Sequence, residues 1–91
     1  MKDVLDEIED IIYRSYPFVR VERYGIAGGV NIIINFYYYG QIYGIKRCVL
    51  YRLISDKNYI QELKDDILED IHYTIRNTRR EKFIKKMEYN Y

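Results

Sequence analysis

The fold class of this chain is decided by residues 18–54, FVRVERYGIAGGVNIIINFYYYGQIYGIKRCVLYRLI. At the start of this stretch Val19 and Val21 alternate with charged residues, which is the period of a half-buried strand. Two further runs are rich in Ile, Val, Phe and Tyr, and glycine-containing turns separate the three runs. We therefore predict strands over residues 18–24, 30–39 and 41–54. Their short connections favour an antiparallel meander.

Helical spacing precedes the predicted sheet. Apolar residues recur every three or four positions between Val4 and Ile12, and Asp3 stands before them as an N-cap. Pro17 disfavours a helical conformation at the residue before it. The pattern predicts a helix over residues 3–16.

A second helical run follows the sheet and predicts a helix over residues 56–76. Beyond it, the tetrad Thr-Arg-Arg-Glu from Thr78 fits a capping box, which predicts a break near Asn77 and a short helix over residues 79–89. The expected fold is α+β: a three-stranded antiparallel sheet with helices on one face, in the order α-β-β-β-α-α.

Composition bounds the class of protein. The chain has 91 residues, 48% of them hydrophobic, which suits one small domain with a core. One cysteine excludes an internal disulfide framework, and residues 1–10 lack a signal-peptide pattern. Glycines and polar residues interrupt the longest uncharged stretch, Gly25–Ile45, so no membrane span is expected. We therefore expect a cytoplasmic protein, inside a host cell.

Charge is nearly balanced overall, at a formal net charge of +1, but its sign alternates along the chain. Residues 1–10 and 56–72 are acidic, whereas residues 11–55 and 73–91 are basic. Such segregation creates local electrostatic fields that the net charge conceals.

The acidic block of the second predicted helix is the strongest functional pattern. Four of its acids cluster on the helix face opposite Ile67: Glu62, Asp65, Asp66 and Glu69. Like charges four residues apart repel each other, so Asp66→Lys is expected to leave the fold intact or to stabilise it slightly. With Asp3, Asp6 and Asp10 of the first helix, the cluster predicts an anionic surface for a cationic groove on a protein partner. The alternative is a solvated helix face.

Twelve tyrosines are the second unusual feature. Those at positions 37–39 are consecutive, so their side chains must point to both faces of a strand. We predict an aromatic partner-binding surface that includes Tyr37, Tyr39 and Tyr43, because tyrosine supplies contact area at low entropic cost. Filling of the core is the alternative.

The basic C-terminal block predicts an alternative, phosphate-binding role. Its cations form the run Arg76, Arg79, Arg80, Lys82, Lys85 and Lys86. The same run also suits the solvated face of a terminal helix. The sheet would extend it if four of its residues shared one side: Arg20, Arg23, Lys46 and Arg47.

Residues that carry chemistry are scarce. His72 is the single histidine and lies on the polar side of its helix, where a solvated side chain is a better interpretation than a metal ligand. Cys48 is the single cysteine and is expected to be a buried structural thiol. Because no set of nucleophile, base and oxyanion donor can be assembled, we expect no catalysis, no metal and no cofactor.

Two resemblances bear on function. The order of elements resembles the double-stranded RNA-binding domain, but residues 56–66 are acidic where that family carries a lysine cluster, so no RNA-binding residue is carried over. In size, in α/β architecture and in its acidic surface, the chain resembles the small anti-CRISPR inhibitors of phages and mobile elements. That resemblance implies a Cas effector as the partner.

The sequence thus predicts a non-catalytic binding protein, an inhibitor that docks on a basic groove of a nucleic-acid-handling protein such as a CRISPR effector. The alternative is a small nucleic-acid-binding protein that uses the basic C-terminal helix. A protein partner with a cationic surface is expected first and nucleic acid second, with no membrane. The oligomeric state, a homodimer included, is left open.

Overall fold

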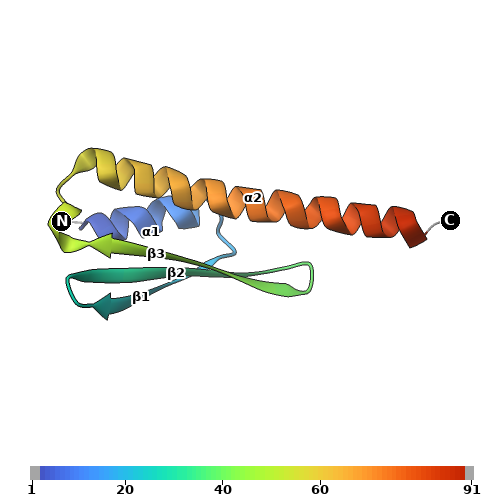
Figure 1. Ribbon diagram of the computed structural model, residues 1–91, viewed down its shortest axis with the longest axis horizontal. Coiled ribbons are helices and arrows are strands. Elements are labelled where there is room, and N and C mark those ends of the chain that lie inside the picture. Colours follow the sequence, from blue (N-terminus) through green and yellow to red (C-terminus); the bar gives the residue numbers. More distant parts are fainter. Residues whose placement is uncertain (1–2, 90–91) are drawn as a thin grey trace.

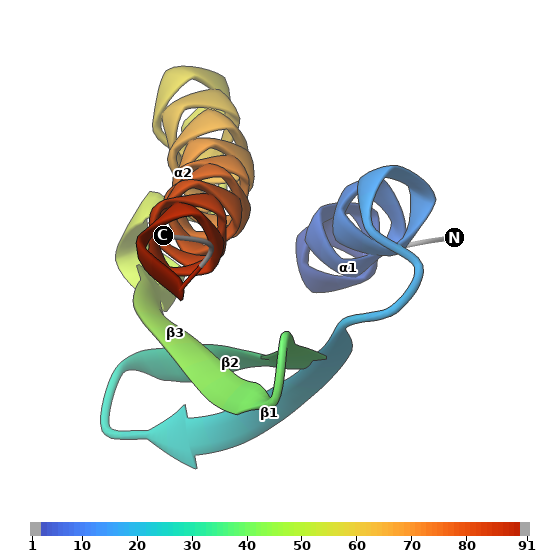
Figure 2. The same cartoon turned by 90° about the vertical axis from the view of Figure 1, so that its right-hand side faces the viewer.

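The computed structural model describes the backbone of residues 3–89 and the side chains of residues 3–79. The elements are α1 (Val4–Ser15), β1 (Arg20–Ile26), β2 (Gly29–Tyr38), β3 (Gln41–Leu50), the short 3₁₀ helix η1 (Tyr51–Leu53) and α2 (Lys57–Tyr89). Both helices lie on one face of the sheet (Figure 1, Figure 2). The predicted α+β fold, an antiparallel three-stranded sheet with helices on one face, is confirmed.

The sheet has the strand order β1-β2-β3 and an unbroken antiparallel register. Along β2, Val30, Ile32 and Ile34 are buried under the helices, and the residues between them point to the other face. We call this second face, which neither helix covers, the open face. No bulge occurs at Gly44, which pairs directly with Asn35.

The first helix forms as its sequence indicates. The Asp3 carboxylate accepts a hydrogen bond from the backbone N–H of Asp6 at 2.8 Å, which caps the helix. The helix ends at Ser15, two residues before Pro17, because proline disfavours a helical conformation at the residue that precedes it.

The core lies between the two helices and the sheet. Its fully buried side chains come from α1, from β2 and β3, and from α2: Ile8, Ile12, Ile32, Ile34, Val49, Ile67 and Ile71. Burying one such side chain stabilises the fold by roughly 1.5–3 kcal/mol. Neither helix in the described part of the chain has an apolar stretch that would cross a bilayer.

Two backbone positions require special geometry. Tyr39 and Gly40 both have positive φ angles, 50° and 81°, which is the signature of the tight hairpin turn between β2 and β3. At the start of β2, a Cβ added to Gly29 would lie 2.3 Å from the backbone oxygen of Val49. Only glycine permits this close approach of the two strands.

The end of the third strand differs from the prediction. β3 stops at Leu50, and the residues expected to complete it, 51–54, form η1 and a turn. The Tyr51 N–H donates to the carbonyl oxygen of Gly28 at 3.0 Å. This bond ties the chain to the β1–β2 turn as it leaves the sheet toward α2.

The predicted break near Asn77 is wrong, since α2 runs without interruption and includes residues 79–89. Thr78 is not a cap but an interior residue, 4% exposed. Its hydroxyl donates to the Thr74 carbonyl oxygen one turn earlier, at 2.8 Å, and lies 2.9 Å from the hydroxyl of Tyr43 on β3. Because these bonds satisfy the hydroxyl inside the helix, Thr78 has no reason to begin a new one.

Candidate functional site

One side of α2 packs on the sheet and the opposite side is acidic. The helix begins after Asp56, whose Oδ1 accepts hydrogen bonds from the backbone N–H groups of residues 58 and 59 at 3.0 and 3.1 Å. Ile67 faces the sheet and is fully buried. The side chains of Glu62, Asp65 and Glu69 lie on the opposite side and are exposed. We call these three carboxylates the outward row.

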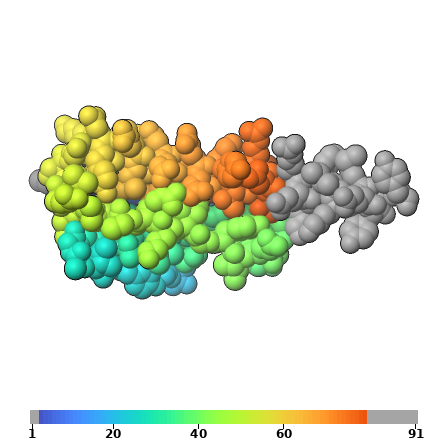
Figure 3. Space-filling view, in the orientation of Figure 1, coloured from blue at the N-terminus to red at the C-terminus, as the bar shows by residue number. Residues whose placement is uncertain are grey.

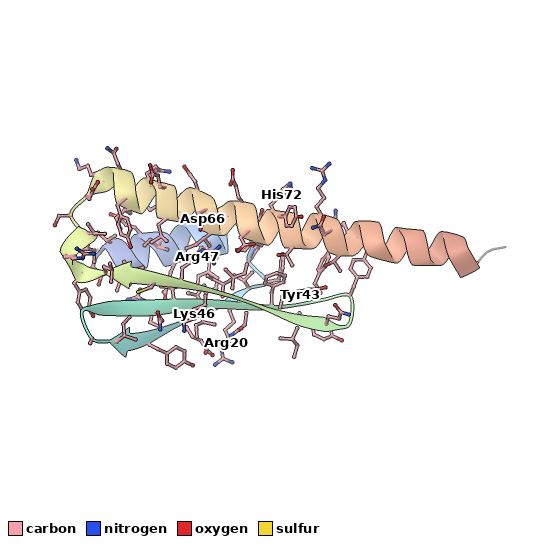
Figure 4. The ribbon with its side chains drawn as sticks, viewed as in Figure 1. Arg20, Tyr43, Lys46, Arg47, Asp66 and His72 are labelled. Atoms are coloured by element: carbon pink, nitrogen blue, oxygen red, sulfur yellow. The ribbon has the colours of Figure 1, made fainter. Side chains whose placement is uncertain are left out.

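Two further acids, Asp66 and Asp70, are held by β3 through Arg47 (Figure 4). The Arg47 Nε donates to Asp66 Oδ2 at 2.7 Å, and its Nη2 donates to Asp70 Oδ2 at 2.6 Å. The hydrogen bond to Asp66 is the largest cause that raises the pKa of Arg47, although partial burial opposes it. We call these two carboxylates the flank row. One arginine thus compensates part of their negative charge inside the chain.

The outward row has no such compensation. Among the residues with described side chains, no lysine or arginine lies within ion-pair distance of its three carboxylates. Asp65 accepts a hydrogen bond from the neutral amide of Gln61 at 3.0 Å. Residues three or four apart on a helix lie about 4.5–6 Å apart along its axis, so the helix spaces the three carboxylates regularly along one face.

Tyr73 continues the outward row one turn beyond Glu69, and its side chain is 64% exposed. It was not among the residues predicted from the sequence, although a position four residues after Glu69 places it on the same helix face. A shallow depression beside this surface is lined by the acids Asp66, Glu69 and Asp70, by Tyr73, and also by Arg47, His72 and Arg76. In the described part of the chain, α2 forms a continuous ridge above the sheet (Figure 3). The ridge thus combines carboxylates that have no ion pair among the described residues with a large exposed ring, and Arg76 lies at its edge.

The acids predicted on the first helix serve the fold instead of joining the outward row. Asp3 caps α1. Asp6 and Glu9 accept hydrogen bonds from Arg23 of β1 at 2.6 and 2.8 Å, and these bonds raise the pKa of Arg23, the one to Glu9 most strongly. Asp10 is half-buried. Because β1 and β3 are opposite edges of the sheet, the arginine pairs of α1 and α2 lie apart.

The three predicted aromatic residues are not brought together on one surface. Tyr37 is 68% exposed and belongs to the open face, and Tyr39 is 54% exposed in the hairpin turn. Tyr43 points to the helix side, where it is half-buried and stacks on Phe36 with ring centroids 5.4 Å apart. Tyr43 is therefore a packing residue beneath α2.

The basic residues are also divided among surfaces. Arg23 points to the helices, since it bonds to two acids of α1. Arg47 also points to the helices, whereas Arg20 and Lys46 point to the open face (Figure 4), so the four do not share one side. Arg76 and Arg79 are exposed on α2. The remaining side chains of the predicted phosphate-binding run, Arg80, Lys82, Lys85 and Lys86, lie outside the described residues.

Cys48 and His72 are both exposed. The expectation of a buried thiol is wrong, because Cys48 neighbours the buried Val49 in β3 and therefore points to the open face. Within the described part of the chain, no group of three or more His, Cys, Asp and Glu side chains is arranged to hold a metal ion.

Comparison of the chain with protein-family models, with curated proteins and with solved structures found no match in any of the three. Its function has to be inferred from the placement of its side chains.

Proposed function

We propose that this chain is a non-catalytic binding protein that docks the outward row and Tyr73 on a cationic groove of a nucleic-acid-handling protein, and so inhibits it. One observation carries the proposal. Glu62, Asp65 and Glu69 stand exposed on one helix face without an ion pair among the described residues, while the neighbouring flank row is paired with Arg47. The fold thus compensates part of the negative charge of α2 and leaves a line of it for a partner.

The geometry suits a groove that normally holds a nucleic-acid backbone. A straight helix presents its charges at fixed intervals, so little side-chain ordering beyond the carboxylates themselves is needed on binding. Complementary charge increases the association rate and disfavours partners without a cationic surface. Tyr73 supplies the large ring that commonly anchors an interface once water is excluded.

The resemblance to anti-CRISPR inhibitors makes a guide-loaded Cas nuclease, in the cytoplasm of a host cell, the first partner to test. The assay measures cleavage of target DNA by a panel of purified guide-loaded effectors, with and without the wild-type chain. We expect inhibition of at least one effector, weakened by salt because the exposed charges are screened.

The matched variants are two triple charge reversals. Replacing Glu62, Asp65 and Glu69 together by lysine is expected to abolish inhibition. Replacing Lys82, Lys85 and Lys86 together by glutamate is expected to matter much less, although it changes as many charges on the same helix. Undiminished inhibition by the first variant would exclude docking through the outward row.

A further inference from the structure

A second groove lies where the α1–β1 connection and the end of β2 approach α2, and it shares His72 and Arg76 with the depression beside the outward row. Its volume is about 390 Å³, near the lower end of the range for small-molecule sites. It is lined by Tyr16, Phe18, Tyr38, His72, Ile75, Arg76 and Arg79. No carboxylate belongs to this lining, and none of the outward row does.

The first wall of the groove is aromatic. Phe18 is 52% exposed, which is unusual for a phenylalanine that also contacts the core. Its ring makes edge contacts with Tyr16 and with buried Phe36, each at 6.1 Å between centroids, and lies nearly parallel to Tyr38 at 6.5 Å. Neighbouring rings thus hold Phe18 in place while half of its surface stays open to solvent.

The side of the groove that α2 forms carries two cations, Arg76 and Arg79. The Arg79 Nε donates a hydrogen bond to the Tyr38 hydroxyl, and its guanidinium carbon lies 5.9 Å from the centre of that ring. These contacts orient Arg79 and leave its two terminal nitrogens without a hydrogen-bond partner among the described residues. Arg76 is exposed one turn earlier, and no described carboxylate lies within ion-pair distance of either arginine.

An aromatic platform beside two arginines that lack a carboxylate partner among the described residues fits a ligand that has both a flat ring and an anionic group. A nucleotide has this composition: its base stacks on an aromatic side chain and its phosphate bonds to arginine. The volume accommodates one such unit. No acid in the lining repels a phosphate.

We propose that this groove binds one nucleotide of a single-stranded nucleic acid, with the base against Phe18 and its phosphate at Arg76 and Arg79. A duplex keeps its bases stacked and paired, so they cannot reach Phe18 without being unpaired. A strand is favoured over a free nucleotide because the sequence continues with Arg80, Lys82, Lys85 and Lys86, which suit the further phosphates of a strand.

The test is fluorescence anisotropy at low salt with labelled ten-nucleotide single strands of DNA and RNA. A duplex of the same length and an unlabelled mononucleotide serve as competitors. We expect single strands to bind most tightly, duplex to compete about tenfold less well, and the mononucleotide to compete only weakly. The affinity for the strand is expected to fall with increasing salt.

Two substitutions and two matched controls locate the site. Phe18→Ala and Arg79→Gln are each expected to weaken strand binding by about tenfold. Tyr37→Ala removes a more exposed ring and Arg20→Gln an exposed cation, both on the open face, and neither is expected to change affinity. If Phe18→Ala lowers the melting temperature, Arg79→Gln still tests the groove, because Arg79 is exposed and its replacement is not expected to destabilise the fold.

Several results would overturn the proposal. Absence of strand binding excludes it outright. If duplex and single strand bind with equal affinity, or if neither groove substitution changes the affinity, the binding is due to the basic run alone and the groove is not the site. Equal affinity for the mononucleotide and the strand makes the ligand a free nucleotide. The outward row lies outside the groove, so reversing Glu62, Asp65 and Glu69 is not expected to weaken strand binding, and this proposal can fail independently of the inhibitor function.

Discussion

The outward row and the flank row of α2 are built from the same kinds of residue, within the nine positions from Glu62 to Asp70, yet their surroundings differ. Asp66 and Asp70 share one cation, Arg47, which reaches them from β3. Glu62, Asp65 and Glu69 have turned away from the sheet and have no cation in the described part of the chain. The density of acids in a sequence therefore does not measure the charge that a surface offers to a partner.

The largest effect is expected from disrupting the buried contact between α2 and the sheet, on which the positions of both rows depend. Ile67 is fully buried between α2 and the sheet. Ile67→Asp places an unpaired carboxylate there, which is expected to cost about 4 kcal/mol or more and to unfold a domain of this size. Circular dichroism should then show no cooperative melt. A melt close to that of the wild type would mean that α2 packs by another face.

A smaller effect is expected from removing the cation of the flank row. Arg47→Ala leaves Asp66 and Asp70 repelling each other without compensation. We expect the free energy of unfolding to fall by about 1–2 kcal/mol in urea titrations. Arg20→Ala is the control, because Arg20 is 80% exposed and pairs with Glu22 at 3.2 Å on the open face. Equal effects of the two substitutions would show that the Arg47 pairs do not support the fold.

Neighbouring aspartates give the sharpest comparison of the rows. Asp66→Lys places a cation beside Arg47 and is expected to destabilise by about 1 kcal/mol, which lowers the melting temperature by roughly 4–8 °C. This is the opposite of the expectation from like-charge spacing alone, because Arg47 pairs with Asp66. Asp65→Lys is expected to leave the melting temperature unchanged or slightly higher. A calorimetric scan gives the melting temperatures of both variants. A lower melting temperature for Asp65→Lys than for Asp66→Lys would contradict the assignment of the rows.

Much of the fold could be predicted because it depends on local patterns. Alternation in β2, the glycines of the turns and the spacing of isoleucines in the helices each act within a few residues. The predicted break near Asn77 failed because the hydroxyl of Thr78 is satisfied by contacts that include Tyr43, which is distant in sequence. A capping motif indicates that a hydroxyl could cap a helix. Whether a helix begins at that position depends on the tertiary packing around it.

The candidate site was predictable in part for the same reason. Helical periodicity located the acids of the outward row. It also places Tyr73 on the same helix face, so this residue could have been predicted. It did not reveal that Arg47 pairs with Asp66, since these residues are 19 positions apart and meet only when β3 is placed beneath α2. Strand alternation did contain the signal that Cys48 and Val49 point to different faces.

The central claim is that the outward row does not contribute to the stability of the fold. Thermal unfolding of one variant tests this claim most directly. The variant replaces Glu62, Asp65 and Glu69 together by lysine. Because no ion pair within the described residues depends on these carboxylates, and because Asp65 and Glu69 repel each other, we expect a cooperative transition at the wild-type melting temperature or slightly above it. A fall of several degrees would show that the row supports the structure, and would contradict the claim that the fold leaves this charge for a partner.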